Sequence, residues 1–322
     1  MSGKPAKLSI AMATYNGAQL VGEQLDSFAA QHRLPDEVVI SDDGSTDTTL
    51  EIIRDFAASA PFPIVLKRNR KQLGIKDNFG KAIAACTGDI IFLSDQDDVW
   101  FPDKLRVVEA YFAANPTVQV LVNEALLADA GLQSRGLTQG AEIRRVIGSN
   151  RNFFTGCCSA HQRSWHDFAL PIPEAALAHD QWINCAAIEL GYAMHVGEVL
   201  QYFRRHGANA SASPLSDPAG YDAWKAFGQN GFADARAGWQ RRADLLNQIL
   251  ARLDETADIA AARGWDRNRP NIEREIAALE RRIALCSVPR RSRIAGVVAH
   301  WATGGYRDAS GWKSAVKDLL RP

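Results

Sequence analysis

The feature that most limits how this chain can fold is an apolar run that ends in a group of acids. Ile90 to Leu93 is continuously apolar, and Asp95, Asp97 and Asp98 follow it within five positions. A short apolar run without helical spacing is typical of a strand buried in a parallel sheet. Ligands bind at the carboxyl ends of the strands in such sheets. We therefore predict a buried strand whose end carries a binding site.

Three carboxylates so close together repel one another, so we expect a cation beside them. A hard divalent ion that takes oxygen ligands, and that also holds phosphate oxygens, is the simplest choice. The alternative is that the acids cap the next helix, for which Asp98 or Asp103 would serve. Capping accounts for one acid and not for three, so the cation site is favoured.

The segments around this run alternate between strand and helix patterns. Strands are predicted at 8–13, 37–41 and 64–66, and each precedes apolar residues at helical spacing. Ser45 is predicted as the N-cap of the second helix, and Pro102 as the first residue of the helix after the acids. The alternation predicts an α/β fold of Rossmann type, with a mostly parallel sheet and helices on both faces. Neither a dinucleotide fingerprint nor a P-loop is present.

The pattern changes along the second half of the chain. Shorter strands and loops are expected from 118 to 205, with a helix at 178–190 that begins with His179 and Asp180. Residues 211–220 have the composition of a linker, and 224–263 with 272–286 form a predicted helical hairpin. We therefore predict a domain at 1–210, divided into halves at 1–115 and 116–210, and a helical, basic extension at 211–322.

Composition narrows the class of protein. Lys plus Arg equals Asp plus Glu at 37 each, so no overall charge favours nucleic acid. The five cysteines form no Cys-x-x-Cys pair, which indicates packed thiols in a reducing compartment. The N-terminus lacks the apolar stretch of an export signal, and no apolar run approaches the roughly 20 residues that span a bilayer. A cytoplasmic protein is expected.

The last segment, 289–322, has a local charge excess. It holds seven Lys or Arg against two Asp, a net +5, with Trp301, Tyr306 and Trp312 between them. Such a segment can lie on the anionic cytoplasmic face of a membrane. An ordinary helical appendage with a solvated basic face explains the pattern equally well.

Three motifs in this order and spacing resemble family 2 glycosyltransferases of GT-A fold. They are Ile10 to Asn16, the run Asp42 to Asp47, and Asp95 to Asp98, and the similarity covers roughly 8–210. The stretch from Ser94 to Trp100, the His179-Asp180 pair and the stretch from Tyr202 to Asn209 look most like rhamnosyltransferase-type members. The chain lacks the Gln-x-x-Arg-Trp motif and membrane helices of the processive synthases, so transfer of a single sugar is favoured.

The resemblance implies a set of nucleotide-sugar contacts. Asp95 and Asp97 match the motif that binds the diphosphate through Mg²⁺ or Mn²⁺, with Asp97 as the more direct ligand and Asp98 behind them. Asp42 and Asp43 match the pair that contacts the ribose and a uracil or thymine base. Further residues expected at this pocket are Thr14, Asn16, Lys76 and Asn78.

The resemblance also implies how the sugar is transferred. Asp180 matches the general base that takes the proton of the acceptor hydroxyl, and one displacement without an enzyme nucleophile inverts the anomeric carbon. The alternative for Asp180 is a first-turn acid that favours the helix dipole. His206 is expected as a third metal ligand or a phosphate contact, and Arg204 or Arg205 as a partner of the diphosphate. The alternative for each is a loop with solvated basic residues. Trp100 and Trp182 either stack on a sugar or belong to the core.

The predicted function is therefore the transfer of one sugar, with rhamnose as a candidate, from a dTDP- or UDP-linked donor. The acceptor is expected to be a saccharide or a lipid-linked saccharide of a surface polysaccharide. Two other classes remain open at this point. A nucleotidyltransferase has a similar sheet but needs a Gly-rich basic loop after the first strand, and a non-catalytic nucleotide-sugar scaffold would have no use for Asp180.

Overall fold

The computed structural model describes residues 5–142, 155–206, 234–306 and 311–320. The chain divides into two compact units, 1–219 and 220–322. The linker predicted at 211–220 and the boundary predicted at 210 lie outside the described residues. The division of the first domain into donor and acceptor halves also stays a prediction.

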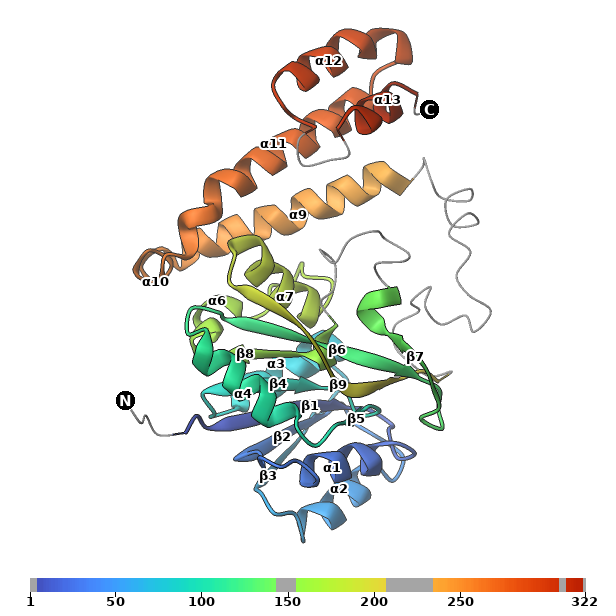
Figure 1. The fold of residues 1–322 in the computed structure, drawn as a ribbon, viewed down its shortest axis with the longest axis vertical. Helices are drawn as coiled ribbons and strands as arrows, with labels where there is room; N and C mark the ends of the chain where they lie inside the picture. The colour runs from blue at the N-terminus through green and yellow to red at the C-terminus, as the bar shows by residue number, and fades with distance from the viewer. Residues whose placement is uncertain (1–4, 143–154, 207–233, 307–310, 321–322) are drawn as a thin grey trace. The chain divides into compact units, whose positions relative to one another are not determined.

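The first half of the N-terminal unit is a parallel sheet (Figure 1). Its strands are β1 (Leu8–Thr14), β2 (Glu37–Asp42), β3 (Ile64–Arg68) and β4 (Ile90–Ser94), in the spatial order β3-β2-β1-β4. The connecting helices are α1 (Val21–Ala29), α2 (Thr49–Ala57) and α3 (Ile75–Ala85). Each predicted strand in this half is confirmed. Because the strands are parallel, the loops after β1, β2 and β4 meet at one edge of the sheet.

The second half of the same sheet is mixed. β8 (Ser159–Gln162) pairs antiparallel with β4, and β6 (Val120–Ala128) pairs antiparallel with β8. β9 (Ala193–Arg204) then runs parallel to β6, and the short β5 (Val99–Trp100) pairs antiparallel with β9. β7 (Ser134–Thr138) also pairs with β6, as a branch outside this order of strands. The parallel arrangement expected from the sequence thus holds for β1 to β4, while the whole sheet is mixed.

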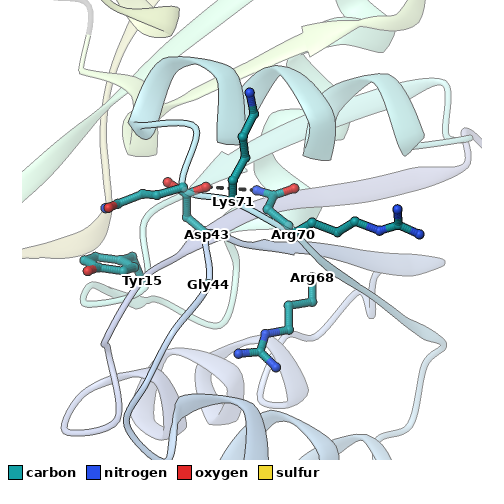
Figure 2. A pocket seen from close by; sticks show the side chains of 8 residues that line it. Tyr15, Asp43, Gly44, Arg68, Arg70 and Lys71 are labelled. Atoms are coloured by element: carbon teal, nitrogen blue, oxygen red, sulfur yellow. Dashed lines mark hydrogen bonds between the residues drawn. The ribbon is translucent and has the colours of Figure 1, made fainter.

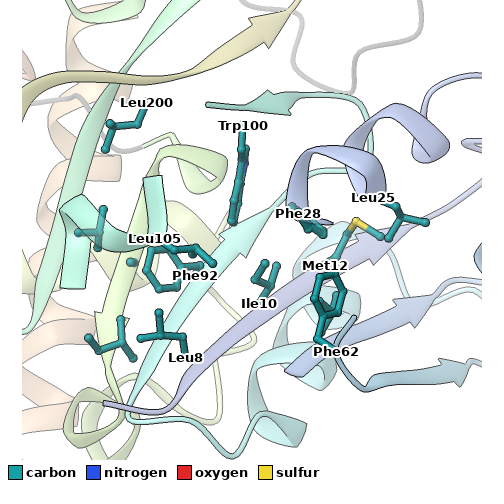
Figure 3. Close-up of a cluster of buried hydrophobic side chains, with 14 of the residues drawn as sticks. Leu8, Ile10, Met12, Leu25, Phe28, Phe62, Phe92, Trp100, Leu105 and Leu200 are labelled. Carbon is teal, nitrogen blue, oxygen red and sulfur yellow. The ribbon is translucent and has the colours of Figure 1, made fainter. Parts of the chain in front are cut away.

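Helices cover both faces of the sheet. Leu8, Ile10 and Met12 of β1 belong to a buried cluster with α1 and with α4 (Lys104–Ala114), as Figure 3 shows. Ala11 of β1 is also buried but lies outside this cluster, because successive side chains of a strand point to opposite faces. On that opposite face α3 contacts β1 and β2, and α7 (His179–Leu190) contacts α3.

Two predicted helix starts are wrong. Helix α2 begins at Thr49, and the Ser45 hydroxyl accepts a hydrogen bond from Asn16 N (2.9 Å) in place of capping it. Asp47 Oδ1 accepts from Thr49 N (3.0 Å) at that helix start. Helix α4 begins at Lys104, and Pro102 lies in the preceding turn, where its carbonyl accepts a hydrogen bond from His32 N (2.9 Å).

The C-terminal unit is helical in the residues that the structure describes. Its helices are α9 (Asp234–Glu255), α10 (Ala257–Arg263), α11 (Arg269–Cys286), α12 (Arg290–Ala302) and α13 (Trp312–Leu320). Helix α9 packs along α11, which confirms the helical hairpin over its described part. No helix within the described ranges has the length and apolar character that crossing a bilayer requires.

The five cysteines are free thiols, as expected. Four of them are buried, and Cys286 is half-buried. Trp100 and Trp182 are also buried, at 2% and 0% exposure, so both belong to the core and neither is available for a sugar.

Candidate active site

The acidic loop after β4 is held against the end of β1 by Gln96. Its side-chain amide donates to Tyr15 O (3.0 Å), and its amide oxygen accepts from Tyr15 N (2.9 Å). Gly17 leaves room for this contact, because a Cβ at that position would lie 2.3 Å from the amide oxygen. Gln96 therefore fixes the backbone that carries the acids on either side of it. No sequence pattern indicates this role of Gln96.

Asp95 and Asp98 lie close to Cys157, with Asp98 and Cys157 buried and Asp95 half-buried. One possible ligand atom from each of these three side chains lies within 4.8 Å of the other two. Among the described residues, these three side chains form the group compact enough to hold a metal ion. Burial, and then the charge of Asp97, raises the pKa of Asp98 to about 7. Burial and the charges of Asp97, Asp98 and Asp180 raise the pKa of Asp95 well above its usual value. The predicted crowding of carboxylates is therefore present.

Part of the counter-charge for these acids comes from the protein itself. Lys104 is 1% exposed, and its ammonium donates to Cys157 O (2.9 Å) and to the side-chain oxygen of Gln201. The Gln201 amide donates in turn to Asp98 Oδ2 (2.9 Å). The Lys104 ammonium also lies 3.9 Å from the centroid of the Trp100 ring. Sequence reasoning had assigned the whole counter-charge to a metal ion and had missed Lys104.

Asp97 and His206 form the more accessible side of the same cluster. Asp97 Oδ2 lies 2.9 Å from His206 Nε2, and their side chains are 17% and 18% exposed. Oxygen and imidazole donors together suit a metal such as Mn²⁺. Burial, and then the charge of Asp97, raises the Asp95 pKa. The donor atoms that approach one another closely among the described residues are those of Asp95, Asp98 and Cys157, without Asp97 or His206, so the ligand set expected from the sequence stays a prediction.

The two acids at the end of β2 are engaged with their own loops. Asp42 is fully buried and accepts hydrogen bonds from Thr14 Oγ1 (3.0 Å), Gly44 N (3.1 Å) and Ser45 N (2.9 Å). The Ser45 hydroxyl adds a fourth bond to Asp42 Oδ2 at 2.5 Å. A carboxylate has about four acceptor positions, so those of Asp42 are occupied. Its observed role is to shape the loop after β2.

Asp43 fixes the basic loop that follows β3. Its carboxylate accepts from Asn69 Nδ2 (3.0 Å), Leu73 N (2.8 Å) and Gly74 N (2.9 Å). Asn69 Nδ2 also donates to Asn78 Oδ1 (2.9 Å). One connected network therefore joins the ends of β2 and β3 to the start of α3.

Asn78 and Asn16, both expected at the nucleotide pocket, hold the loops of the site together. Asn78 Nδ2 donates to Thr14 O (3.3 Å). Asn16, at a φ of 46°, accepts from Thr46 N (2.9 Å). The loops after β1 and β2 are thereby joined. Lys76 is directed elsewhere, since its ammonium donates to Pro173 O (3.3 Å) and Glu174 O (2.7 Å).

A cavity of about 460 Å³ opens beside Asp43 (Figure 2). It is lined by Tyr15, Asp43, Gly44, Arg68, Asn69, Arg70, Lys71 and Gln72. Figure 2 shows the three cationic side chains extending in different directions, so they do not converge on one anion. Tyr15, 43% exposed, presents its ring at this cavity. Asp180 and the acids after β4 are not part of its lining.

Asp180 lies in the first turn of α7, as predicted. Its Oδ1 accepts from Gln181 N (2.8 Å), and its Oδ2 accepts from Gly156 N (3.1 Å). Gly156 permits this approach, because a Cβ there would lie 2.7 Å from His179 Nε2 and 3.1 Å from Asp180 Cβ. The His179 ring stacks on Phe79 with centroids 3.8 Å apart, which ties α7 to α3. Asp180 lies near the acidic loop, since its charge raises the Asp95 pKa.

The two arginines after Phe203 have different surroundings. The Arg204 guanidinium is buried and donates to Ala130 O (3.0 Å) and Glu23 Oε2 (2.5 Å), while Arg204 N donates to Asp98 Oδ1 (3.1 Å). The guanidinium of Arg204 is thus committed to α1 and to the turn after β6. The Arg205 guanidinium nitrogens are buried without a hydrogen-bond partner in the described structure. Burial lowers the pKa of Arg205, and the charge of Asp98 offsets part of this shift.

The pH dependence of stability should report the burial of Asp98. Its pKa rises from 3.8 to about 7 on folding, so the folded state holds the proton more tightly between these values. The stability contributed by this group is complete below pH 3.8 and is lost as the pH rises toward 7. Without divalent ions, the melting temperature of the wild type should therefore decrease over this range relative to that of Asp98→Asn. Parallel curves for the two proteins, measured by scanning calorimetry, would show that Asp98 titrates normally.

Comparisons with known proteins agree on one family. The model of glycosyl transferase family 2 matches residues 9–168. An uncharacterized glycosyltransferase of Nostoc sp. is 28% identical over 276 residues, which are 82% of this chain and 81% of the relative. A dTDP-rhamnosyl transferase of Shigella flexneri is 41% identical over 99 residues, 30% of this chain and 34% of the relative.

A solved structure shares the fold at low sequence identity. It is a mannosyltransferase of Pyrobaculum calidifontis in complex with GDP-Man and Mn²⁺. The match covers 98% of this chain and 86% of that chain, at 18% identity and a TM-score of 0.53.

Proposed function

Because this chain belongs to glycosyl transferase family 2 and has the GT-A fold, we propose that it moves one sugar from a nucleoside-diphosphate donor to a saccharide acceptor. The observation that supports this most is the gathering of Asp95, Asp97, His206 and Asp180 around the end of β4. The acids there are crowded enough to raise one another's pKa, which favours binding of a cation in their midst. The family match also leaves no support for the nucleotidyltransferase alternative or for a scaffold without activity.

The metal ligands proposed are Asp97, Asp95 and His206, with Asp98 holding the loop behind them. Mg²⁺ or Mn²⁺ bound there would neutralise negative charge on the leaving diphosphate. The mannosyltransferase bound to GDP-Man and Mn²⁺ supports a divalent ion in this fold. Arg205 replaces Arg204 as the proposed diphosphate partner. The Arg205 guanidinium has no hydrogen-bond partner in the described structure, and the charge of Asp98 raises its pKa against the effect of burial.

The nucleoside is proposed to bind at the cavity beside Asp43. Tyr15 supplies an aromatic face for a base, and the network of Asn69 and Asn78 fixes the loops on either side. Asp42, Thr14 and Asn16 shape these loops, and we assign them no contact with the donor. Lys76 is assigned no donor contact either, since its ammonium bonds two carbonyls.

Asp180 is proposed as the general base. Its carboxylate is half-buried, lies near Asp95, and is oriented by the backbone N–H of Gly156. A carboxylate beside the acceptor hydroxyl takes its proton as the oxygen attacks the sugar, and the displaced diphosphate leaves from the opposite face. One such displacement inverts the anomeric carbon.

The donor is proposed to be a dTDP- or UDP-sugar, with rhamnose as the first sugar to test. The local similarity to a dTDP-rhamnosyl transferase supports this choice over 30% of the chain. A lipid-linked saccharide of a surface polysaccharide is proposed as the acceptor. Such an acceptor would place the reaction at the cytoplasmic face of a membrane.

A panel of nucleotide sugars tests the proposal. With Mn²⁺ or Mg²⁺ present, one donor should raise the melting temperature more than its free nucleotide does, because a ligand that binds only the folded state stabilises it. A donor at about 100 times its dissociation constant adds about 2.7 kcal/mol. The same donor should then give product with a lipid-linked saccharide fraction. If no nucleotide sugar shifts the melting temperature, the proposed function is wrong.

A further inference from the structure

Helix α12 exposes an apolar stripe. Ile294 and Val298 are each 61% exposed and Trp301 is 48% exposed, at positions i, i+4 and i+7 of one helix face. The residue before each of them, Arg293, Val297 and His300, is buried at 3–4% exposure. The helix therefore buries Arg293, Val297 and His300 and leaves three large apolar residues in solvent. An amphipathic helix usually keeps such residues on its buried face.

Helix α13 repeats the arrangement. Trp312 is 62% exposed and Val316 is 42% exposed, one turn apart, whereas Ala315 and Asp318 are buried. Helices α12 and α13 are packed together around Val297, Tyr306 and Ala315. We name the exposed set, Ile294, Val298, Trp301, Trp312 and Val316, the C-terminal apolar surface. Large apolar side chains left exposed on two packed helices indicate a binding surface.

The exposed charge on the described side chains of the same helices is positive. Asp318 is the acid within α12 and α13, and it is fully buried in an ion pair with Arg282 Nε (2.8 Å). Arg291 is exposed in the first turn of α12. The sequence places Lys313 and Lys317 directly after the exposed Trp312 and Val316 of α13. In the side chains that the structure describes, the two helices thus combine exposed apolar residues with the exposed Arg291, and no acid among them is exposed.

We propose that the C-terminal apolar surface docks on an anionic lipid bilayer. Tryptophans beside basic residues fit the interface between headgroups and acyl chains, where the ring enters and the cation meets anionic headgroups. A second copy of the chain fits less well, because pairing this surface with itself would oppose like charges. The five exposed apolar residues favour the membrane interpretation of the basic segment over a merely solvated face.

Binding of the full-length protein to vesicles tests the docking surface. Sedimentation is measured with vesicles of phosphatidylcholine alone and of phosphatidylcholine mixed with phosphatidylglycerol. We expect binding to the anionic vesicles and loss of this binding at high salt. The double variant Ile294→Ser/Trp312→Ser should bind them at least about tenfold more weakly, because both side chains lose apolar area that would enter the bilayer.

A matched control separates this effect from a loss of folding. Ile259→Ser removes an apolar residue of α10 that is 37% exposed and lies outside the surface, and it should bind like the wild type. Donor binding, measured by thermal shift, should be the same in all variants, so this test is independent of the proposed function. Equal sedimentation of the wild type with both vesicle types would overturn the proposal. So would a dimer in solution that the double variant abolishes in the absence of lipid.

Discussion

Asp97→Asn is expected to lower the rate of sugar transfer at least about a thousandfold. The substitution keeps the size of the side chain but removes a negative charge and weakens one metal ligand. A cation that stabilises the leaving diphosphate contributes several kcal/mol, and each 1.36 kcal/mol is tenfold in rate. His206, 2.9 Å from Asp97, would lose its charged partner as well. Initial rates with the preferred donor at saturating Mn²⁺ measure the effect.

The control for this variant is Asp55→Asn. Asp55 is an exposed acid on α2, remote in sequence from the acidic loop, and the change should leave the rate unaltered. The folding of both variants can be compared by their melting temperatures without metal. If Asp97→Asn retains more than about a tenth of the wild-type rate while folded, then Asp97 does not hold the catalytic ion.

The second large effect is expected at Asp180. Asp180→Asn should reduce transfer by about 10²- to 10⁴-fold, the range that general-base catalysis contributes. Its affinity for the donor should stay within about a factor of two to three, because the nucleotide contacts lie elsewhere. Calorimetry of donor binding, performed beside product formation, separates these quantities.

The competing explanation of Asp180 predicts a different outcome. As an acid in the first turn of α7, it would stabilise the helix by about 0.3–1 kcal/mol and do nothing more. Glu51 occupies the first turn of α2 and is exposed, so Glu51→Gln gives the size of that effect alone. If Asp180→Asn loses only as much stability as Glu51→Gln and keeps its activity, the base is another group.

Local patterns in the sequence were sufficient for the elements that carry the site. The strands β1, β2 and β4 are buried along almost their whole length, and burial on both faces makes the apolar runs within them recognisable without alignment. Because parallel strands end at one edge, the acids after β2 and β4 were placed on the same side of the sheet. The antiparallel insertion of β8 between β4 and β6 could not be predicted, since it pairs residues as distant in sequence as Ile91 and His161.

The assignment of individual side chains required the structure. Arg204 and Arg205 are neighbours at the end of β9, so their side chains must point to opposite faces, but the sequence does not say which faces the acids. Lys104 is a surface-type residue at a helix start, and no periodicity indicates that its ammonium is buried against Gln201, which in turn bonds Asp98. Ser45 was wrongly predicted to cap a helix. Its actual bond, with Asn16 N, joins two loops far apart in sequence, so no local pattern indicates it.

The central claim is that the acids at the end of β4 hold one divalent ion that binds the donor diphosphate. Counting bound Mn²⁺ by electron paramagnetic resonance, with and without the nucleoside diphosphate, tests it most directly. We expect one Mn²⁺ per wild-type chain, held more tightly when the nucleotide is present, because the coupling between two ligands is reciprocal. In Asp97→Asn both the ion and its coupling to the nucleotide should be lost. Nucleotide binding that is indifferent to Mn²⁺ in both proteins would contradict the account.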